Sequence, residues 1–360
     1  MTLAAPLVDV GIAVHDDRRP VDRAVRSVLD GTTSPVRVTV VAHNLAERKI
    51  ADRLGDLVSD PRVRLIGLQD GIRSPAGPFN AALQAADATF TSMMGSDDTL
   101  QPGAIDAWLK SARRDRADVV IARLRHASGA PVPTPPTRPG RTRLLHPLRD
   151  RLSYRSAPLG LVRRERFPEL RFATGLAVGE DVSYVTALWF SGARITYART
   201  SPSYLIHDDA AERTTYSDRS VIDELAFVMR LIESPLFHSL PLSSRRAIAV
   251  KVTRIHLFGI ILNRPDDEWW TPSQRRGLER VSGAIEQSAP GFARVLSRAD
   301  RQLLDAVGDC SSEISQLRLL ADQRRRFLRP AALIPRGLSN IAAREAPLRM
   351  SFASWLQTRG

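Results

Sequence analysis

Short β-branched segments alternate with helix-like segments over the first third of the chain. Residues 8–14 and 36–42 have the apolar composition of buried strands, and the apolar residues of 20–30 recur at the spacing of one helix face. The same pattern predicts further strands at 63–68, 89–94 and 119–124 and further helices at 46–57, 78–86 and 102–114. Strands that alternate with helices form a mostly parallel sheet with helices on both faces, so we expect an α/β fold.

The pattern changes at about residue 217. Residues 129–140 contain five prolines and are expected to form a loop or linker, with short strands to follow at 159–162 and 195–198. Helical patterns then follow at 221–233, 245–262, 272–287 and 298–326, before a basic tail at 330–360. We therefore expect two domains, an α/β domain over 1–216 and a helical C-terminal domain over 217–360.

The chain is strongly basic, with a formal net charge of +13. The positive charge is almost all arginine, because lysine occurs only at Lys49, Lys110 and Lys251. A basic surface attracts nucleic acid, anionic lipid or phosphorylated small molecules, and the planar guanidinium suits phosphate. No zinc-finger or homeodomain pattern accompanies the charge, so we do not expect a nucleic-acid partner. A compositional bias of the genome is an alternative explanation for the arginines.

Cysteine usage and hydropathy indicate the compartment. Cys310 is the single cysteine, which excludes an internal disulfide framework and fits a reducing compartment. Residues 1–8 lack the basic and long apolar regions of a secretory signal. The longest apolar run, near 257–262, is far shorter than the roughly 20 residues of a membrane helix. These features predict a cytoplasmic protein.

Two adjacent carboxylates, Asp97 and Asp98, follow the expected strand at 89–94. In α/β sheets, ligands bind beyond this end of the strands. Magnesium or manganese prefers carboxylate oxygens and leaves positions open for substrate phosphates, so this pair is a candidate site for a cation and a diphosphate. The alternative is that Asp98 caps a helix that begins at Pro102.

A second acid pair, Glu180 and Asp181, directly follows Gly179 and precedes a helical pattern. The positive field of a helix N-terminus favours ionised carboxylates, and an ionised carboxylate near an acceptor hydroxyl can serve as a general base. The alternative is the ordinary enrichment of acids in a first helical turn. Sugar transfer from a nucleotide requires both functions: one acid pair that holds a metal and a diphosphate, and another that accepts a proton.

Polar residues also follow two other expected strands. His207 follows the strand-like run at 204–206 and is a candidate third metal ligand or phosphate donor, with Arg213 a candidate diphosphate ligand. His15 and Asp16 end the first expected strand, where they would contact a nucleoside. A loop histidine, a solvated arginine and a polar turn are the corresponding alternatives.

In their order along the chain, these segments resemble the family 2 glycosyltransferases, which have the GT-A fold, a Rossmann-like mixed and mostly parallel sheet with helices on both faces. The likeness covers about residues 7–216. It rests on VDVGIAVHDDRRPVDRAVRSVLDGT near the N-terminus, SPAGPFNAALQAADATFTSMMGSDDTLQPGAI at 74–105, LRFATGLAVGEDVSYVTALWFSGARITY at 170–197 and YLIHDDAAERTT at 204–215. The central block and the acid-pair block are fairly specific together.

The resemblance implies a metal-dependent, inverting enzyme. Asp98 would ligate manganese or magnesium, Asp97 would help with the ribose or the metal, and Asn80, at the usual asparagine, would belong to the nucleotide-sugar site. Asp181 would deprotonate the acceptor hydroxyl, with Glu180 as its neighbour. The implied partners are a nucleotide-sugar donor and a glycan or lipid-linked acceptor of cell-surface glycan or glycolipid synthesis. The basic tail adds an expected peripheral contact with anionic membrane at its inner face.

Three positions depart from the family pattern. Asn44 lies in Ala42-His43-Asn44-Leu45, where members often have Asp-Asp-Gly-Ser, and is the residue there expected to contact the nucleotide. Gly95 replaces the first acid of the usual Asp-Ser-Asp-Asp run, and Phe79 replaces a basic residue. These departures leave two alternatives open: a catalytically inactive binding protein of the same fold, and, from charge alone, a nucleic-acid-binding protein.

Overall fold

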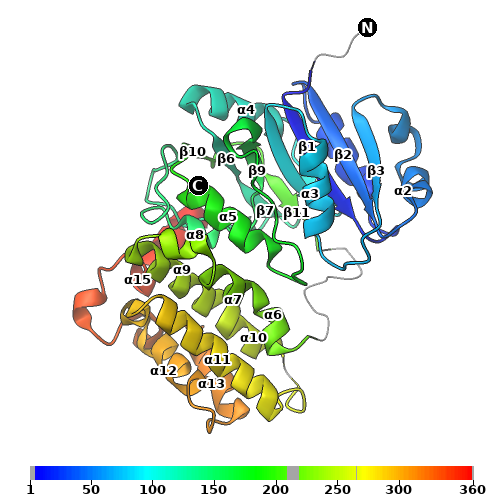
Figure 1. The fold of residues 1–360 in the computed structure, drawn as a ribbon. Helices are drawn as coiled ribbons and strands as arrows, with labels where there is room; N and C mark the ends of the chain where they lie inside the picture. The colour runs from blue at the N-terminus through cyan, green and yellow to red at the C-terminus, as the bar shows by residue number, and fades with distance from the viewer. Residues whose placement is uncertain (1–4, 209–218, 265, 359–360) are drawn as a thin grey trace.

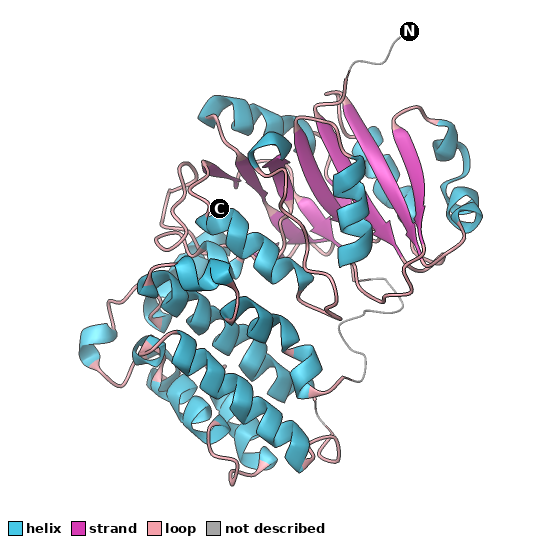
Figure 2. Cartoon of the chain, in the orientation of Figure 1, coloured by secondary structure: helices cyan, strands magenta, loops and turns pink. Residues whose placement is uncertain are grey.

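The computed structural model describes residues 5–208, 219–264 and 266–358, which form an α/β part followed by a helical part (Figures 1 and 2). The strands are β1 (Val8–Val14), β2 (Val36–His43), β3 (Val63–Leu68), β4 (Phe90–Gly95), β5 (Thr99–Leu100), β6 (Val119–Ala122), β7 (Leu124–His126), β8 (Pro131–Val132), β9 (Gly160–Arg163), β10 (Ile195–Ala198) and β11 (Tyr204–Ile206). The main sheet has the order β10-β6-β9-β4-β1-β2-β3, and a smaller sheet has the order β5-β11-β7-β8. Within the main sheet only β9 runs antiparallel, against both β4 and β6. The expected mostly parallel sheet is confirmed.

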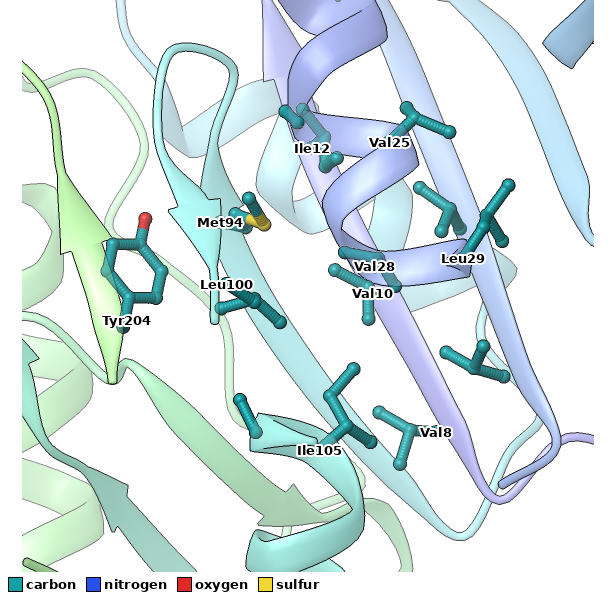
Figure 3. Packing of buried hydrophobic residues seen from close by; sticks show 14 of the residues in the cluster. Val8, Val10, Ile12, Val25, Val28, Leu29, Met94, Leu100, Ile105 and Tyr204 are labelled. Atoms are coloured by element: carbon teal, nitrogen blue, oxygen red, sulfur yellow. The ribbon is translucent and has the colours of Figure 1, made fainter. Parts of the chain in front are cut away.

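Five helices belong to the α/β part: α1 (Val21–Leu29), α2 (Glu47–Leu54), α3 (Ala76–Ala85), α4 (Ala104–Asp115) and α5 (Glu180–Phe190). One face of the central strand β1 buries Val8, Val10 and Ile12 against the apolar stripe of α1, which includes Val25 and Val28 (Figure 3). Burying each such side chain contributes about 1.5–3 kcal/mol relative to its exposure. The other face of β1 is covered by α3, so both faces of the strand are buried, and its one charged residue, Asp9, is paired with Arg37.

A glycine on the other face of β1 brings α3 close to the sheet. A Cβ atom at Gly11 would lie 2.7 Å from the Cβ atom of Ala82 in α3, which is closer than side chains pack. Glycine therefore allows α3 to lie directly against the strand.

The helical part begins, among the described residues, after β11. Its elements are α6 (Val221–Glu224), α7 (Ala226–Ile232), α8 (Pro235–Ser239), α9 (Leu242–Val252), a π-helical segment (Thr253–Leu257), α10 (Phe258–Asn263), α11 (Pro272–Ser288), α12 (Arg298–Val307), α13 (Ile314–Gln323), α14 (Pro330–Leu333) and α15 (Pro347–Thr358). The expected helix at 298–326 is two helices, because Asp309 accepts hydrogen bonds from the backbone and hydroxyl of Ser311 and closes a turn.

The two parts meet at α5, which lies between the sheet and the helices (Figure 1). Leu176 and Val182, near the start of α5, belong to the same apolar cluster as the core of the helical part. Gly179 has a φ of +74° and lies directly under the ring of Phe227 in α7, which leaves no room for a side chain. The expected border at residue 216 lies outside the described residues, so the division into 1–216 and 217–360 remains a prediction.

No helix in the described ranges of the chain is both long enough and apolar enough to span a bilayer.

Candidate active site

The first acid motif lies at the carboxyl end of β4, next to the central strand. Asp98 accepts hydrogen bonds on both oxygens: the Tyr204 hydroxyl donates to Oδ2 at 2.6 Å and the His207 amide to Oδ1 at 3.1 Å. The Tyr204 hydroxyl in turn accepts from the amide of Gly95 at 3.0 Å. Burial raises the pKa of Asp98, while the Tyr204 and His207 donors oppose that rise. Asp98 is therefore a well-positioned, partly desolvated carboxyl group at the binding edge of the sheet.

Asp97 is held by arginines from the start of the chain. The Arg19 guanidinium lies 2.8 Å from its carboxylate, and Arg23 of α1 donates to its carbonyl at 2.5 Å. A Cβ atom at Gly95 would lie 2.7 Å from Oδ2 of Asp98, so a side chain at this position would collide with the carboxylate in its present place. The replacement of the first acid of the family run by Gly95 thus goes together with the close packing of the Asp98 carboxylate against this residue.

Among the described residues, no three His, Cys, Asp or Glu side chains come together as a metal cluster. Magnesium at phosphate-transfer sites nevertheless needs only one or two protein carboxylates, because phosphate oxygens and waters complete its octahedron. Asp97 and Asp98 supply carboxylates of this kind at the edge where a diphosphate would bind. The donor set therefore fits a cation that enters together with a diphosphate.

The second acid motif begins α5, as expected. Burial raises the pKa of Glu180 to about 7, and the neighbouring Asp181 carboxylate adds to this shift. Burial also raises the pKa of Asp181 to about 6, against the opposing charge of Lys251. A carboxyl group with a pKa near 6 is ionised at neutral pH and is still basic enough to accept a proton, which suits a general base.

Glu180 and Asp181 line a cavity of about 320 Å³ whose walls come from both parts of the chain. The helical part contributes apolar and polar side chains, including Phe227, His256 and Asn263. Sequence patterns near Glu180 gave no indication of these distant wall residues.

The two acid motifs lie at the same edge of the main sheet. The helix α5 leads into β10, which is parallel to β6, and β6 has the same direction as β4 because β9 runs antiparallel to both. A helix that returns the chain to a parallel strand begins at the carboxyl edge of the sheet. Asp97 and Asp98 are not among the residues that line the cavity with Asp181. The convergence of both motifs on one substrate remains a prediction.

The remaining metal and nucleotide candidates are distributed along this edge. Nε2 of His207 lies 2.9 Å from the hydroxyl of Thr99. His15 lies in the turn after β1 and is exposed, and Asp16 forms a bidentate pair with Arg18, at 3.0 and 2.7 Å. The Arg18 guanidinium lowers the pKa of Asp16 to about 2. Arg213 lies outside the described residues.

Asn44 and Asn80 make structural hydrogen bonds. The side-chain oxygen of Asn44, whose φ is +54°, accepts from the amides of Asp70 and Gly71 at 3.1 and 2.9 Å. The Asn80 amide exchanges two hydrogen bonds with the backbone of Phe172, at 2.8 and 3.0 Å. Asn80 thereby fixes the segment that leads to Glu180. Their assignment to the nucleotide site remains a prediction.

Sequence reasoning missed several residues at these two motifs. Tyr204 and Arg19 contact the first acid pair and the charge of Lys251 acts on Asp181, but none of the three lies in the sequence motif of the acid that it affects. Tyr204 was recognisable only as part of a short strand. Its partner Asp98 is more than a hundred residues away in the chain, so the pairing depends on β11 lying beside β5.

Comparison with known proteins assigns this architecture. Residues 9–171 match the model of the family described as Glycosyl transferase family 2. The succinoglycan biosynthesis protein ExoO of Rhizobium meliloti (strain 1021) is 32% identical over 119 residues, a match that spans only 33% of this chain and 33% of that protein.

Among solved structures, residues 1–349 of TarS from S. aureus, in complex with UDP-GlcNAc, superpose with a TM-score of 0.70 at 17% identity. The match covers 89% of this chain and 92% of that one, and it therefore includes the helical part as well as the sheet. This similarity establishes a shared GT-A fold. The family match over residues 9–171 shows in addition that the α/β part of this chain is similar to members of glycosyl transferase family 2.

Proposed function

We propose that this protein transfers a sugar from a nucleoside-diphosphate donor to an acceptor hydroxyl, with inversion, in the synthesis of a cell-surface glycan or glycolipid. The observation that carries the proposal is the desolvated pair Glu180 and Asp181, which opens into a cavity at the binding edge of a family 2 fold. The UDP-GlcNAc in the TarS structure supports a nucleotide-sugar donor, and the name of ExoO supports a glycan product.

In this reaction Asp181 accepts the proton of the acceptor hydroxyl. The acceptor oxygen forms a bond to the anomeric carbon while the bond from that carbon to the diphosphate oxygen breaks, and the nucleoside diphosphate leaves. A single displacement of this kind inverts the anomeric centre. Glu180, with the higher pKa of the two, carries the proton that the pair shares near neutral pH and leaves Asp181 anionic.

The leaving diphosphate belongs at the end of β4. Asp97 and Asp98 would hold a divalent cation there, and the cation supplies charge neutralisation for the departing diphosphate. The guanidinium of Arg19, which is paired with Asp97, adds a second positive group at the same place. The buried hydroxyl of Tyr204 fixes the orientation of Asp98.

The acceptor belongs in the cavity beside Asp181. Phe227 and Ile260 give it an apolar wall, and Ser156 and Asn263 place hydroxyl and amide groups on its lining. Sugar rings have apolar faces and polar edges, so a wall of this mixed type suits a glycan or a lipid-linked sugar.

A thermal-shift screen of nucleotide sugars, with and without manganese, tests the donor site. We expect one donor to raise Tm in the presence of manganese, because a ligand at about a hundred times its Kd stabilises the native state by about 2.7 kcal/mol. Asp98→Asn should remove the manganese-dependent part of the shift. Asp56→Asn, at an exposed position on the 3₁₀ helix Gly55–Ser59, should retain it. The absence of a shift with every nucleotide sugar would refute the donor assignment.

A binding protein without turnover is the second candidate. The Arg19 pairing of Asp97 and the structural hydrogen bonds of Asn44 favour it, because both engage groups that the active-site assignment uses. Product release measured on the donor found in the screen separates the two: a shift in Tm without released nucleoside diphosphate, with any acceptor, would favour binding alone.

The exposed face of α15 is proposed to contact anionic membrane. Leu348, Phe352 and Trp355 are 39, 56 and 45% exposed, and their spacing places them on one side of the helix, opposite the buried Ala353. The rings of Phe352 and Trp355 stack at 6.0 Å. Residues 324–358 contain seven arginines and a single acid, Glu345, so the charge of this region favours an anionic lipid surface.

Vesicle sedimentation of the full chain tests this contact. We expect binding to vesicles that contain phosphatidylglycerol, weaker binding to purely zwitterionic vesicles, and a loss of binding of about tenfold in the double variant Phe352→Ser with Trp355→Ser, because two interfacial aromatic anchors are removed. Leu319→Ser, at a 55% exposed position on α13, is the matched control. Equal binding by the double variant and the wild-type protein would contradict the role of α15.

A further inference from the structure

A buried lysine of the helical part is hydrogen-bonded to a wall residue of the cavity that the acid pair lines. Lys251, near the end of α9, is only 3% exposed, and its ammonium group donates a hydrogen bond of 2.7 Å to Nε2 of His256. Burial lowers the pKa of Lys251 to about 8, while the Asp181 carboxylate opposes this decrease. Lys251 is therefore still a cation at neutral pH. Its partner His256 lines the same cavity as Asp181, so the ammonium group lies one hydrogen bond behind the wall of that cavity.

His256 is a neutral acceptor for this cation. Burial lowers the pKa of His256 well below its usual value, and the charge of Lys251 lowers it further. The ring also packs edge-on against Phe227, with its centroid 4.8 Å away, and so has a fixed orientation. A neutral imidazole that accepts at Nε2 orients the ammonium group without competing for its charge.

The local helix geometry brings the two side chains together. Residues five apart in an α-helix point in directions that differ by about 140°. The chain between Lys251 and His256 passes into the π-helical segment Thr253–Leu257, whose wider turn brings such residues to one side. Single π-helical turns are frequent at functional sites.

Other charged groups around the cavity are engaged differently. Glu180, beside Asp181, holds a raised pKa and is the carboxyl group that is protonated first. Glu224 forms a salt bridge with Arg264, and Arg219 is on the lining of the cavity. Of the described charged groups, Lys251 is the one whose charge lowers the pKa of Asp181.

We propose that Lys251, oriented by His256, is a positioning residue that the helical part supplies to keep Asp181 in its anionic form. The base is then assembled from both parts of the chain, and the helical part is necessary for catalysis as well as for the shape of the cavity. This inference rests on the proposed function, in which Asp181 accepts the acceptor proton.

A stability cycle tests the charge coupling without any catalytic measurement. Lys251→Met is expected to lower Tm at pH 7 in the wild-type background but to leave it unchanged or raise it in Asp181→Asn, where the buried cation has lost its carboxylate. This difference between backgrounds should vanish below pH 5, where Asp181 is protonated, and above pH 9.5, where Lys251 is neutral. An equal effect of Lys251→Met in both backgrounds at every pH would overturn the proposal.

The pH dependence of kcat/KM is the second readout, with the donor found in the thermal-shift screen. Lys251→Met should move the acidic limb upward by about one pH unit, because an opposite charge close to a carboxylate lowers its pKa by about that much or more. Lys251→Arg should retain the wild-type limb, and Lys110→Met, exposed on α4, is the control.

The outcomes are distinguishable from those for the proposed function. An acidic limb that does not move in Lys251→Met would exclude the positioning role even if the enzyme is active. If no nucleotide sugar supports turnover, the proposed function fails, and the stability cycle still decides whether Lys251 controls the charge of Asp181.

Discussion

Asp181→Asn is expected to reduce kcat for sugar transfer about 10²–10⁴-fold, the range that general-base catalysis contributes. The asparagine amide has nearly the shape of the carboxylate but cannot accept a proton, so the acceptor hydroxyl loses its base while the helix start and the cavity remain. Initial rates of nucleoside-diphosphate release, with the donor at saturation, measure the effect. Asp56→Asn, exposed and outside the cavity lining, should keep the wild-type rate.

The pH dependence of kcat/KM in the wild-type protein is a second test of the role of Asp181. Because the base must be ionised and burial raises the pKa of Asp181 to about 6, kcat/KM should fall roughly tenfold per pH unit as the pH decreases below that value. The residual activity of Asp181→Asn should lack this dependence. If Asp181→Asn keeps more than a tenth of the wild-type kcat, another group deprotonates the acceptor.

Asp300→Asn is expected to lower the free energy of unfolding by about 3–5 kcal/mol, the cost of breaking a buried ion pair from one side. Asp300 lies in the first turn of α12 with its side chain 6% exposed, and its two oxygens bind Arg254 at 3.0 Å and Arg324 at 2.6 Å. Arg254 also donates to the carbonyl of Glu345. One carboxylate thus joins α12 to the π-helical segment, the end of α13 and the tail, and its loss leaves the buried Arg254 and the partly buried Arg324 without their carboxylate.

Urea unfolding followed by circular dichroism measures this loss, and Asp305→Asn on the same helix is its control. Asp305 is 41% exposed and pairs with Arg301 and Arg336 at the surface, so its substitution should cost less than about 1 kcal/mol. Arg254 and Arg324 hold the pKa of Asp300 below its usual value in spite of burial. Its contribution is therefore fully present above the unfolded pKa of about 3.9 and is lost as the pH falls through the lower folded value. Equal losses in both variants would contradict the buried network.

Local patterns were sufficient for most of the α/β elements. The strand expected at 8–14 is β1, and the strand expected at 195–198 is β10, with the same bounds. The periodic spacing of apolar residues, bounded by residues that end helices and strands, predicts such elements because each element buries one of its faces in the core. The helices of the second half were recognised as helical, but the break near Gly308 and the π-helical segment within 245–262 depend on hydrogen bonds and packing that periodicity does not encode.

The candidate acids were identifiable because each lies at an element boundary that the sequence marks. Gly179 precedes Glu180 where only a glycine can lie beneath Phe227, and Gly95 ends β4 beside Asp98. What each acid would contact was not identifiable. Tyr204, Arg19 and Lys251 come from three other segments, and a single charged or hydroxyl side chain carries no spacing signal that would assign it to a distant partner.

The sequence by itself determined the α/β class, the mostly parallel sheet, the helical second half and the positions of the two acid pairs, since these follow from periodicity and from residues adjacent in the chain. Only the tertiary structure decided the ionisation of those acids and the composition of the cavity. Burial raises the pKa of Asp181, and the charge of Lys251, a residue seventy positions further along the chain, opposes that rise. Desolvation and Coulomb interactions depend on distance in space, and the fold alone determines that distance.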